Sequence, residues 1–324
     1  MRALQITELS GPAAVSVADV PEPGPGDGLF GGEGVVVEVE AAGVSFPEVL
    51  QTRGEYQVKP ELPFVPGSEV SGRVRSAPEV SGLEAGQPVM AFPMLGGLAE
   101  VAVAPTNFTF PRPGALDAAQ GAALILNYHT AYFALKLRGR LVEGETVLVH
   151  GAAGGVGTAT LQVAKGLGAK TIAVVSSDEK ETVARDAGAD DVVRSDGDWR
   201  GAVKELGKAD VIVDPVGGDR FTDSLRSLKE EGRLVVVGFT AGSIPEVKVN
   251  RLLRNNVDVV GAGWGAYVLS RPEVTAEIQT ALDGLIESGH VRPVVGARFG
   301  LDEAQQALEL IDGRGATGKV VVEI

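Results

Sequence analysis

The sequence predicts an α/β protein in which a β-rich N-terminal region precedes a doubly wound parallel sheet. Residues 1–120 contain short apolar runs separated by Gly- and Pro-rich turns, including the turn cluster Pro21–Gly34. A helical pattern begins after Asp117, and strands and helices then alternate to about residue 266. Such alternation is typical of βαβ units, whose strands form one parallel sheet with helices on both faces.

The elements of the N-terminal region follow from its apolar runs. The first residues, MRALQITEL, are expected to form a strand and lack the hydrophobic segment of a signal peptide. Four further strands are expected over Val35–Val39, Val70–Val74, Pro88–Phe92 and Leu98–Val103. Asp117 is expected to cap a helix over residues 118–136, because Asp is a favoured N-cap residue.

The segment Thr146–Lys180 predicts a dinucleotide-binding turn. Thr146–His150 is a short apolar strand, and a helix ending at Gly168 and a second strand, Thr171–Val175, follow it. Between the first strand and the helix lie the closely spaced glycines Gly151, Gly154, Gly155 and Gly157. Glycines here let backbone N–H groups approach a pyrophosphate, and the helix N-terminus adds a partial positive charge. The residues expected to contact a dinucleotide are Gly154, Gly155, Val156 and Gly157, and the alternative is a tight turn without a ligand.

The end of the second strand favours NADP over NAD. An NAD-binding chain usually places a carboxylate there to contact the ribose 2′-hydroxyl, whereas this strand ends in Ser176 and Ser177. Hydroxyl groups and the nearby cations Lys180 and Arg194 suit a 2′-phosphate. Asp178 is a competing carboxylate, which we interpret as the N-cap of the next helix.

The remaining elements place further loops beside the cofactor. Later strands are expected over Asp190–Val193, Asp210–Asp214, Arg233–Gly238, Val257–Gly261 and the C-terminal KVVVEI. The charged run Lys229–Glu231 is interpreted as a solvated helix end. Helices are expected over Glu179–Ala187, 273–289 and Leu301–Leu310. Because ligands bind beyond the carboxyl ends of parallel strands, we expect cofactor contacts from Val216, Gly238, Phe239 and Thr240.

Composition excludes several functional classes. The chain has 324 residues, 44% of them hydrophobic and 22% charged, as expected for a soluble protein of two domains. Its formal net charge of −14 disfavours nucleic-acid and anionic-membrane partners. No apolar stretch reaches the ~18 residues of a membrane span. The absence of Cys excludes disulfides, thiolate catalysis and Cys-based metal sites, and a cytoplasmic location is expected.

Motifs spread over nearly the full length resemble those of one protein family. They are GVSFPEVL (43–50), PFVPGSEVSG (63–72), LGGLAE (95–100), NYHTAYFAL (127–135), VHGAAGGVG (149–157), DPVGG (214–218), GRLVVVGF (232–239) and GKVVV (318–322). In this order they resemble the medium-chain dehydrogenase/reductases, specifically the zinc-free, zeta-crystallin-like quinone oxidoreductases. The resemblance implies a Rossmann domain (121–266) inserted into a GroES-like β-barrel catalytic domain (1–120 and 267–324), with the active site in the cleft.

Departures from the superfamily's alcohol dehydrogenases argue against zinc. Those enzymes bind a catalytic zinc with a Cys in the first motif and a His before the Glu of the second. By this resemblance, Ser45 stands at the position of the Cys and Ser68 at the position of the His, whereas the Glu is retained as Glu69. Zinc takes Cys, His and carboxylate ligands, and the three His residues lack a ligand-like spacing: His129, His150 and His290. The first lies beside the expected nicotinamide site, the second is interpreted as structural, and the third is expected in a surface turn.

Without zinc, the expected hydride acceptors of an NADPH enzyme are quinones and α,β-unsaturated carbonyls, because conjugation spreads the developing charge. Tyr56 resembles a tyrosine with which enoyl reductases of the superfamily donate a proton or hold the substrate; the alternative is that it only lines the cleft. Ser45, Asn127 and Thr130 match family positions near the nicotinamide, and the last two could instead be structural residues at helix ends. Lys319 could reach the cofactor or be solvated, and we favour the second interpretation.

Three functions remain open from the sequence. The first is an NADPH-dependent reductase of a small-molecule quinone or enone, and the second is an NADPH-binding sensor without turnover. The third is a 2-enoyl thioester reductase, which would need a basic groove for the carrier phosphates, and no basic cluster lies near the N-terminal motifs. The resemblance further implies a homodimer.

Overall fold

In a computed structural model that describes residues 1–29 and 31–324, the chain forms two compact units. Unit 1 comprises Met1–Leu126, Pro272–Gln279 and Pro293–Ile324, and unit 2 comprises Asn127–Arg271 and Thr280–Arg292. The first change of unit follows Leu126 rather than residue 120, and Thr280–Arg292 belongs to unit 2 rather than to the C-terminal part of the catalytic domain.

Unit 2 contains a six-stranded parallel sheet with the strand order β10-β9-β8-β11-β12-β13. This order is that of the doubly wound Rossmann sheet, so the predicted fold class is confirmed. The strands are β8 (Thr146–His150), β9 (Lys170–Val175), β10 (Asp191–Arg194), β11 (Ala209–Asp214), β12 (Leu228–Val236) and β13 (Asp258–Gly261).

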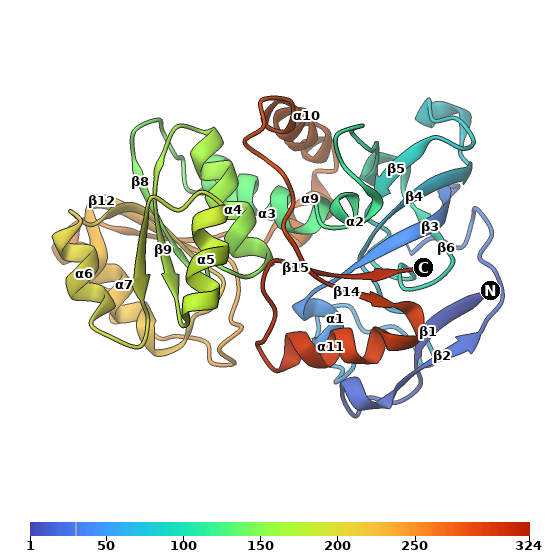
Figure 1. The fold of residues 1–324 in the computed structure, drawn as a ribbon, viewed down its shortest axis with the longest axis horizontal. Helices are drawn as coiled ribbons and strands as arrows, with labels where there is room; N and C mark the ends of the chain where they lie inside the picture. The colour runs from blue at the N-terminus through green and yellow to red at the C-terminus, as the bar shows by residue number, and fades with distance from the viewer. Residues whose placement is uncertain (30) are drawn as a thin grey trace. The chain divides into compact units, whose positions relative to one another are not determined.

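Helices cover both faces of this sheet (Figure 1). In that view α4 and α5 lie on one side of the strands and α6 and α7 on the other. The helices of this part of the chain are α4 (Gly155–Gly166), α5 (Asp178–Asp186), α6 (Trp199–Glu205), α7 (Phe221–Ser227), α8 (Asn250–Asn255) and α9 (Trp264–Ser270). The core between the sheet and one helical layer includes Leu148 and Ile212 of the strands and Trp199, Phe221 and Leu225 of α6 and α7.

Two expectations for unit 2 were wrong. The charged run Lys229–Glu231 belongs to β12 and not to a helix end, and Lys229 pairs with Asp210 of the neighbouring strand at 2.7 Å. The register of β11 against β12 shifts between Ala209 and Val211, so a local irregularity accommodates the polar residues within a strand. The third strand, β10, also begins one residue later than predicted.

Unit 1 contains a mostly antiparallel sheet with the order β14-β15-β3-β4-β5-β7, and β6 also pairs with β3. A separate hairpin pairs β1 (Arg2–Ile6) with β2 (Val15–Asp19). The larger sheet consists of β3 (Val35–Val44), β4 (Glu69–Ser76), β5 (Pro88–Ala91), β6 (Val101–Ala104), β7 (Thr109–Pro111), β14 (Val295–Gly300) and β15 (Lys319–Glu323). The C-terminal strand pairs with β3, so the end of the chain completes a sheet begun near its start.

Helices of unit 1 are short. They are α1 (Phe46–Gln51), α2 (Ala118–Gly121) and α11 (Ala304–Asp312), and α10 (Glu273–Glu287) contains residues of both units. Single turns of 3-10 helix lie at Pro12–Ala14, Glu79–Ser81, Thr106–Phe108 and Leu301–Glu303, and in unit 2 at Gly218–Arg220. Ala304, Ala307 and Leu308 of α11 pack into the main apolar core of the unit.

The helix expected over residues 118–136 is interrupted. Asp117 caps α2 as predicted, and its side chain accepts the Gln120 N–H at 2.7 Å. The chain then continues as π-helical turns at Ile125–His129 and Phe133–Arg138 on either side of α3 (Thr130–Tyr132). π-Helical turns are rare and often occur near functional sites. Within the described chain, no helix is both long and apolar enough to cross a membrane.

Candidate functional site

The glycine turn after β8 packs too closely against α4 and Asn127 to accept side chains at Gly155 and Gly157. A Cβ on Gly157 would lie 2.2 Å from the carbonyl oxygen of Gly151, so α4 can approach the strand only with glycine there. Gly151 itself has a φ of +57°, which favours glycine. The first N–H inside α4 to bond a helix carbonyl is that of Thr158, which bonds Gly154. The preceding N–H groups of the helix N-terminus are therefore not used by its own ladder.

Other predicted cofactor residues lie around this turn. The Asn127 amide packs against the start of α4, because a Cβ on Gly155 would come within 2.4 Å of its Nδ2. The Val216 side chain lies over the turn, where a Cβ on Gly151 would be 3.1 Å from its Cγ2. The structure thus brings Asn127 and Val216 to the same end of the sheet as the glycines.

The loops after β11 and β12 are joined to each other. The Asp214 carboxylate at the end of β11 accepts the N–H groups of Val216 and Gly217 at 2.8 and 2.9 Å. Thr240 N–H bonds the carbonyl of Pro215 at 3.1 Å, which ties the second loop to the first. Phe239, between Gly238 and Thr240, is 36% exposed and lies against Gly217. These contacts place the predicted loop residues at the carboxyl edge, where parallel sheets bind ligands.

The corner after β9 corrects one interpretation. Ser177, not Asp178, is the N-cap of α5, and its hydroxyl accepts the Lys180 N–H at 3.3 Å. Asp178 is instead the first residue of the helix, and its carboxylate pairs with the Arg194 guanidinium. Arg194 also contacts Asp196 and donates to the Ser176 carbonyl at 3.1 Å. The four polar residues predicted for a 2′-phosphate lie together here, but both arms of the Arg194 guanidinium already pair with carboxylates, one with Asp178 and the other with Asp196.

Unit 1 holds a buried ion pair that the sequence did not predict. The interpretation of Lys319 as solvated is wrong, because its side chain is only 2% exposed. Its Nζ donates to the Ser45 hydroxyl and pairs with the Glu69 carboxylate. Gly43 makes room for the pair, since a Cβ there would lie 2.6 Å from Lys319 Cε and 2.8 Å from Glu69 Cγ. A charge can be buried this fully only when it is paired and hydrogen-bonded.

A second buried carboxylate, Glu48, lies beside this pair. It accepts the Ser45 N–H at 2.8 Å, the Ser68 N–H at 3.0 Å and the Ser68 hydroxyl. Complete burial raises the pKa of Glu48, while the Lys319 charge and the hydrogen bonds act in the opposite direction. We call Ser45, Glu48, Ser68, Glu69 and Lys319 the Lys319 cluster; Ser45 is its one partly exposed member, and the other four are buried.

Tyr56 follows α1 and is half-buried. Burial, and secondly the negative charge of Glu48, raise the pKa of its phenol above the usual 10.0. The phenol is therefore protonated throughout the neutral range and can act as a hydrogen-bond or proton donor. The influence of Glu48 also indicates that Tyr56 lies near the Lys319 cluster.

Thr130 and two of the three His residues are buried, and the third His is exposed. Thr130 and His129 are buried where the π-helical turn meets α3, and the His129 ring lies edge-on to Trp264 at 5.4 Å. His150 is fully buried, and its Nε2 lies 2.8 Å from the Ser224 hydroxyl, which fits its structural interpretation. The third histidine, at position 290, is exposed as expected.

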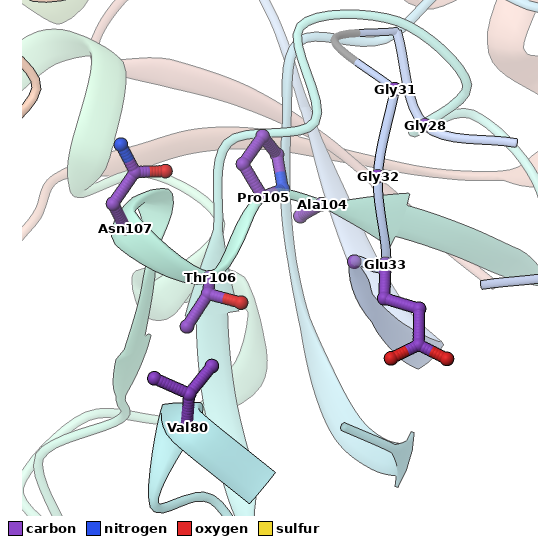
Figure 2. Close-up of a pocket in the computed structure, with 10 residues that line it drawn as sticks. Gly28, Gly31, Gly32, Glu33, Val80, Ala104, Pro105, Thr106 and Asn107 are labelled. Atoms are coloured by element: carbon purple, nitrogen blue, oxygen red, sulfur yellow. The ribbon is translucent and has the colours of Figure 1, made fainter. Parts of the chain in front are cut away.

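A surface cavity of about 450 Å³ in unit 1 includes none of the predicted site residues. Figure 2 shows its lining, in which Glu33 is the one charged side chain among the described residues. The other lining residues are Gly28, Gly31, Gly32, Gly34, Val80, Ala104, Pro105, Thr106 and Asn107. No acid–base pair or group of cations converges among these residues, so we do not assign the reaction to this cavity.

Comparison with known proteins identifies the family. Residues 31–114 match the family described as "Alcohol dehydrogenase GroES-like domain", and residues 155–284 match "Zinc-binding dehydrogenase". "Quinone oxidoreductase-like protein 2" of Bos taurus is 39% identical over 297 residues, covering 90% of this chain and 85% of that protein. The chain belongs to the quinone oxidoreductase family of the medium-chain dehydrogenase/reductases.

Solved structures of related oxidoreductases agree with this assignment. A probable oxidoreductase from Mycobacterium abscessus shares 45% identity with a TM-score of 0.90, over 100% of this chain and 99% of that chain. The quinone oxidoreductase from Thermus thermophilus, also solved in complex with NADPH, shares 34% identity with a TM-score of 0.85, over 100% of both chains. The GroES-like and Rossmann parts predicted from the sequence are thereby confirmed.

The donor set of this quinone oxidoreductase relative does not fit zinc. In the Lys319 cluster, Ser45 and Ser68 offer neutral hydroxyls, and the Glu69 carboxylate is already paired with an ammonium. Zinc binds thiolate, imidazole and carboxylate groups, and a protonated lysine both lacks a lone pair and repels a cation. Across the described residues, no three side chains of His, Cys, Asp or Glu converge as a metal site.

The sequence did not predict the charged members of the Lys319 cluster as site residues. Glu48 and Glu69 lie inside the quoted family motifs, but their burial depends on strands that pair across the unit. One signal was available for Lys319: it directly precedes three apolar residues, and the first four residues of the strand prove to be buried. Fully buried strands give near-continuous apolar runs, so a charge within one indicates a buried partner.

Proposed function

We propose that this protein is a zinc-independent, NADPH-dependent reductase of quinones or α,β-unsaturated carbonyls. One observation carries the proposal: Ser45 and Ser68, which match the zinc-ligand positions of related alcohol dehydrogenases, contact a buried ammonium and a buried carboxylate. That arrangement suits acceptors whose conjugation spreads the developing charge. The relationship to quinone oxidoreductases, one of them solved with NADPH, supports the same interpretation.

The residues of unit 2 fit a dinucleotide. Gly155 and Gly157 let α4 pack directly against Asn127 and the Gly151 turn, and the N-terminus of α4 offers N–H groups to a pyrophosphate. When bound, NADPH supplies a hydride, and the acceptor takes up that hydride together with one proton. The further residues proposed to contact the cofactor are Ser45, Asn127, Thr130, Gly154, Val156, Ser176, Ser177, Lys180, Arg194, Val216, Gly238, Phe239 and Thr240.

Tyr56 is the proposed proton donor. A phenol is protonated at neutral pH, and burial raises the pKa of Tyr56 further, so its oxygen carries a proton when the acceptor binds. Burial and the Glu48 charge oppose loss of that proton, so donation requires an acceptor oxygen that has already gained negative charge from the hydride. Reprotonation from solvent completes the cycle.

The test is NADPH consumption with a panel of naphthoquinones and enones. We expect oxidation with at least one acceptor and weaker activity with NADH. Tyr56→Phe is expected to lower kcat by about 10²-fold, the low end for removing a general acid. Tyr132→Phe is the matched control, because burial also raises the pKa of that phenol. Tight NADPH binding without turnover on the whole panel would support a sensor instead.

We also propose that the chain forms a homodimer through β13. This strand is at the edge of the unit 2 sheet, and Asp258 and Val259 on it are exposed. An exposed edge presents unpaired backbone N–H and C=O groups that a second copy can satisfy. Light scattering coupled to size-exclusion chromatography measures the mass directly, and a monomer at micromolar concentration would contradict the proposal.

A further inference from the structure

Only one member of the Lys319 cluster is partly exposed to solvent. Glu48, Ser68, Glu69 and Lys319 are each at most 4% exposed, whereas Ser45 is partly exposed. A small molecule that approaches the cluster from outside can therefore touch it at Ser45. The properties of that hydroxyl depend on the charged groups behind it.

The direction of the hydrogen bonds fixes what Ser45 can do. Lys319 has donors and no acceptor, so its ammonium donates to the Ser45 oxygen. With a donor already on its oxygen, the Ser45 hydroxyl has its own proton left to donate. The adjacent positive charge polarises that O–H and makes it a stronger donor.

Glu69 keeps the ammonium in place. One of its carboxylate oxygens pairs with Lys319, and the other accepts the Leu126 N–H at 2.9 Å. The backbone at Gly43 packs closely against both side chains, since a Cβ there would collide with each of them. The Lys319 charge is thus fixed beside Ser45 before any substrate arrives, and fixed charges and dipoles are what stabilise developing charge efficiently.

We propose that the Ser45 hydroxyl, positioned and polarised by Lys319, donates a hydrogen bond to the carbonyl oxygen of the acceptor as negative charge builds there. Ser45 is then the catalytic residue and Lys319 the positioning residue, and together they take the role that a metal ion has in zinc-dependent relatives. The inference rests on the proposed function, since it needs a carbonyl acceptor. It involves no bond breaking at Ser45, which keeps its proton throughout.

The kinetic test uses two variants. One is Ser45→Ala, and the other is a double variant, Glu69→Gln with Lys319→Met, which replaces both charged side chains of the ion pair by neutral ones. The paired replacement avoids leaving a buried carboxylate without its partner, which would endanger folding. Each change is expected to lower kcat by about 10²-fold, as for loss of one oxyanion donor. The triple variant should fall within about threefold of Ser45→Ala alone, because groups that act as one unit are not additive.

Ser71→Ala is the control variant. Ser71 is buried in the same sheet, and its hydroxyl bonds the Val89 carbonyl at 2.9 Å and accepts from Arg112, outside the Lys319 cluster. It should cost stability without changing kcat. If Ser45→Ala keeps the wild-type kcat, or if the losses multiply in the triple variant, the inference is overturned.

A spectroscopic test is independent of turnover. With the protein saturated with NADP⁺, which cannot deliver a hydride, infrared difference spectra report the carbonyl stretch of bound 1,4-naphthoquinone. We expect a shift to lower wavenumber that disappears in Ser45→Ala and in the Glu69/Lys319 double variant. An unshifted carbonyl in the wild type overturns the inference. If the shift is present but NADPH is never oxidised, the proposed function fails and the inference about Ser45 stands.

Discussion

Acidification should destabilise unit 2 through His150. The residue ends β8 and is fully buried, with its ring edge-on to Trp199 at 5.1 Å. Burial lowers its pKa from 6.5 to about 4, with Asp214 acting to raise it and Arg220 to lower it. Since the Ser224 hydroxyl donates to the Arg220 carbonyl, we assign the proton of the neutral ring to Nε2, which donates to Ser224.

The sign and size of the effect follow from the two pKa values. The unfolded chain binds a proton at His150 near pH 6.5 and the folded chain only near pH 4, so acid favours unfolding. The effect of His150 on the free energy of unfolding is absent well above pH 6.5. It grows as the pH is lowered from 6.5 to about 4, and it is constant below about pH 4. Each pKa unit corresponds to about 1.4 kcal/mol, which gives a loss of about 2 kcal/mol at pH 5 and about 3 kcal/mol in full.

The assay is urea unfolding of the wild type and His150→Gln at pH 7.5, 6 and 5, followed by tryptophan fluorescence. Both tryptophans, Trp199 and Trp264, belong to unit 2, so the signal reports on that unit. Glutamine retains an N–H donor but does not titrate. We expect the wild type to lose about 2 kcal/mol more than the variant between pH 7.5 and 5.

His290→Gln is the control for this experiment, because that side chain is exposed and should leave the wild-type pH dependence unchanged. Parallel losses in the wild type and His150→Gln would refute the reasoning. They would mean that other groups account for the whole pH dependence.

Three further outcomes follow from the described contacts. Asp178→Asn frees one arm of Arg194 and should tighten binding of 2′,5′-ADP about two- to fivefold, the range for an exposed ion pair, while leaving 5′-AMP unchanged in calorimetry. Gly157→Ala places a Cβ 2.2 Å from the Gly151 carbonyl, so we expect a lower melting temperature and loss of NADPH binding; a wild-type melting curve would contradict this close packing. Val259→Lys should convert a dimer to a monomer in light scattering, and an unchanged mass would place the interface elsewhere.

The sequence predicted the parallel sheet well because its signals are local. Thr146–His150 is a strand over the predicted residues, and the glycine turn and α4 follow it in the expected order. Strand β3 is longer than predicted, because its second half, Ala41–Val44, is buried among small residues that carry no alternation of apolar and polar side chains. The roles of the predicted cofactor residues stay predictions, although the structure places Asn127 and Val216 at the glycine turn.

The Lys319 cluster could not be predicted from local signals. Lys319 and Ser45 are 274 positions apart in sequence, and Lys319 and Glu69 are 250 apart. They meet because β15 pairs with β3, and β3 pairs with β4. Local periodicity says nothing about which strands pair, so a single sequence shows a lysine and a glutamate but not their contact.

Burial has opposite consequences for the two basic residues discussed here, and the difference lies in their partners. Lys319 is buried beside the Glu69 carboxylate, so the Coulomb attraction offsets the cost of desolvating its charge. His150 is buried beside a neutral hydroxyl. Asp214 raises its pKa, but by less than burial lowers it, so the ring stays neutral. The same physical cost is therefore offset by an ion pair in unit 1 and yields a neutral ring in unit 2. An ammonium held in place by a carboxylate suits a site that must stabilise negative charge, whereas the neutral imidazole makes unit 2 sensitive to acid.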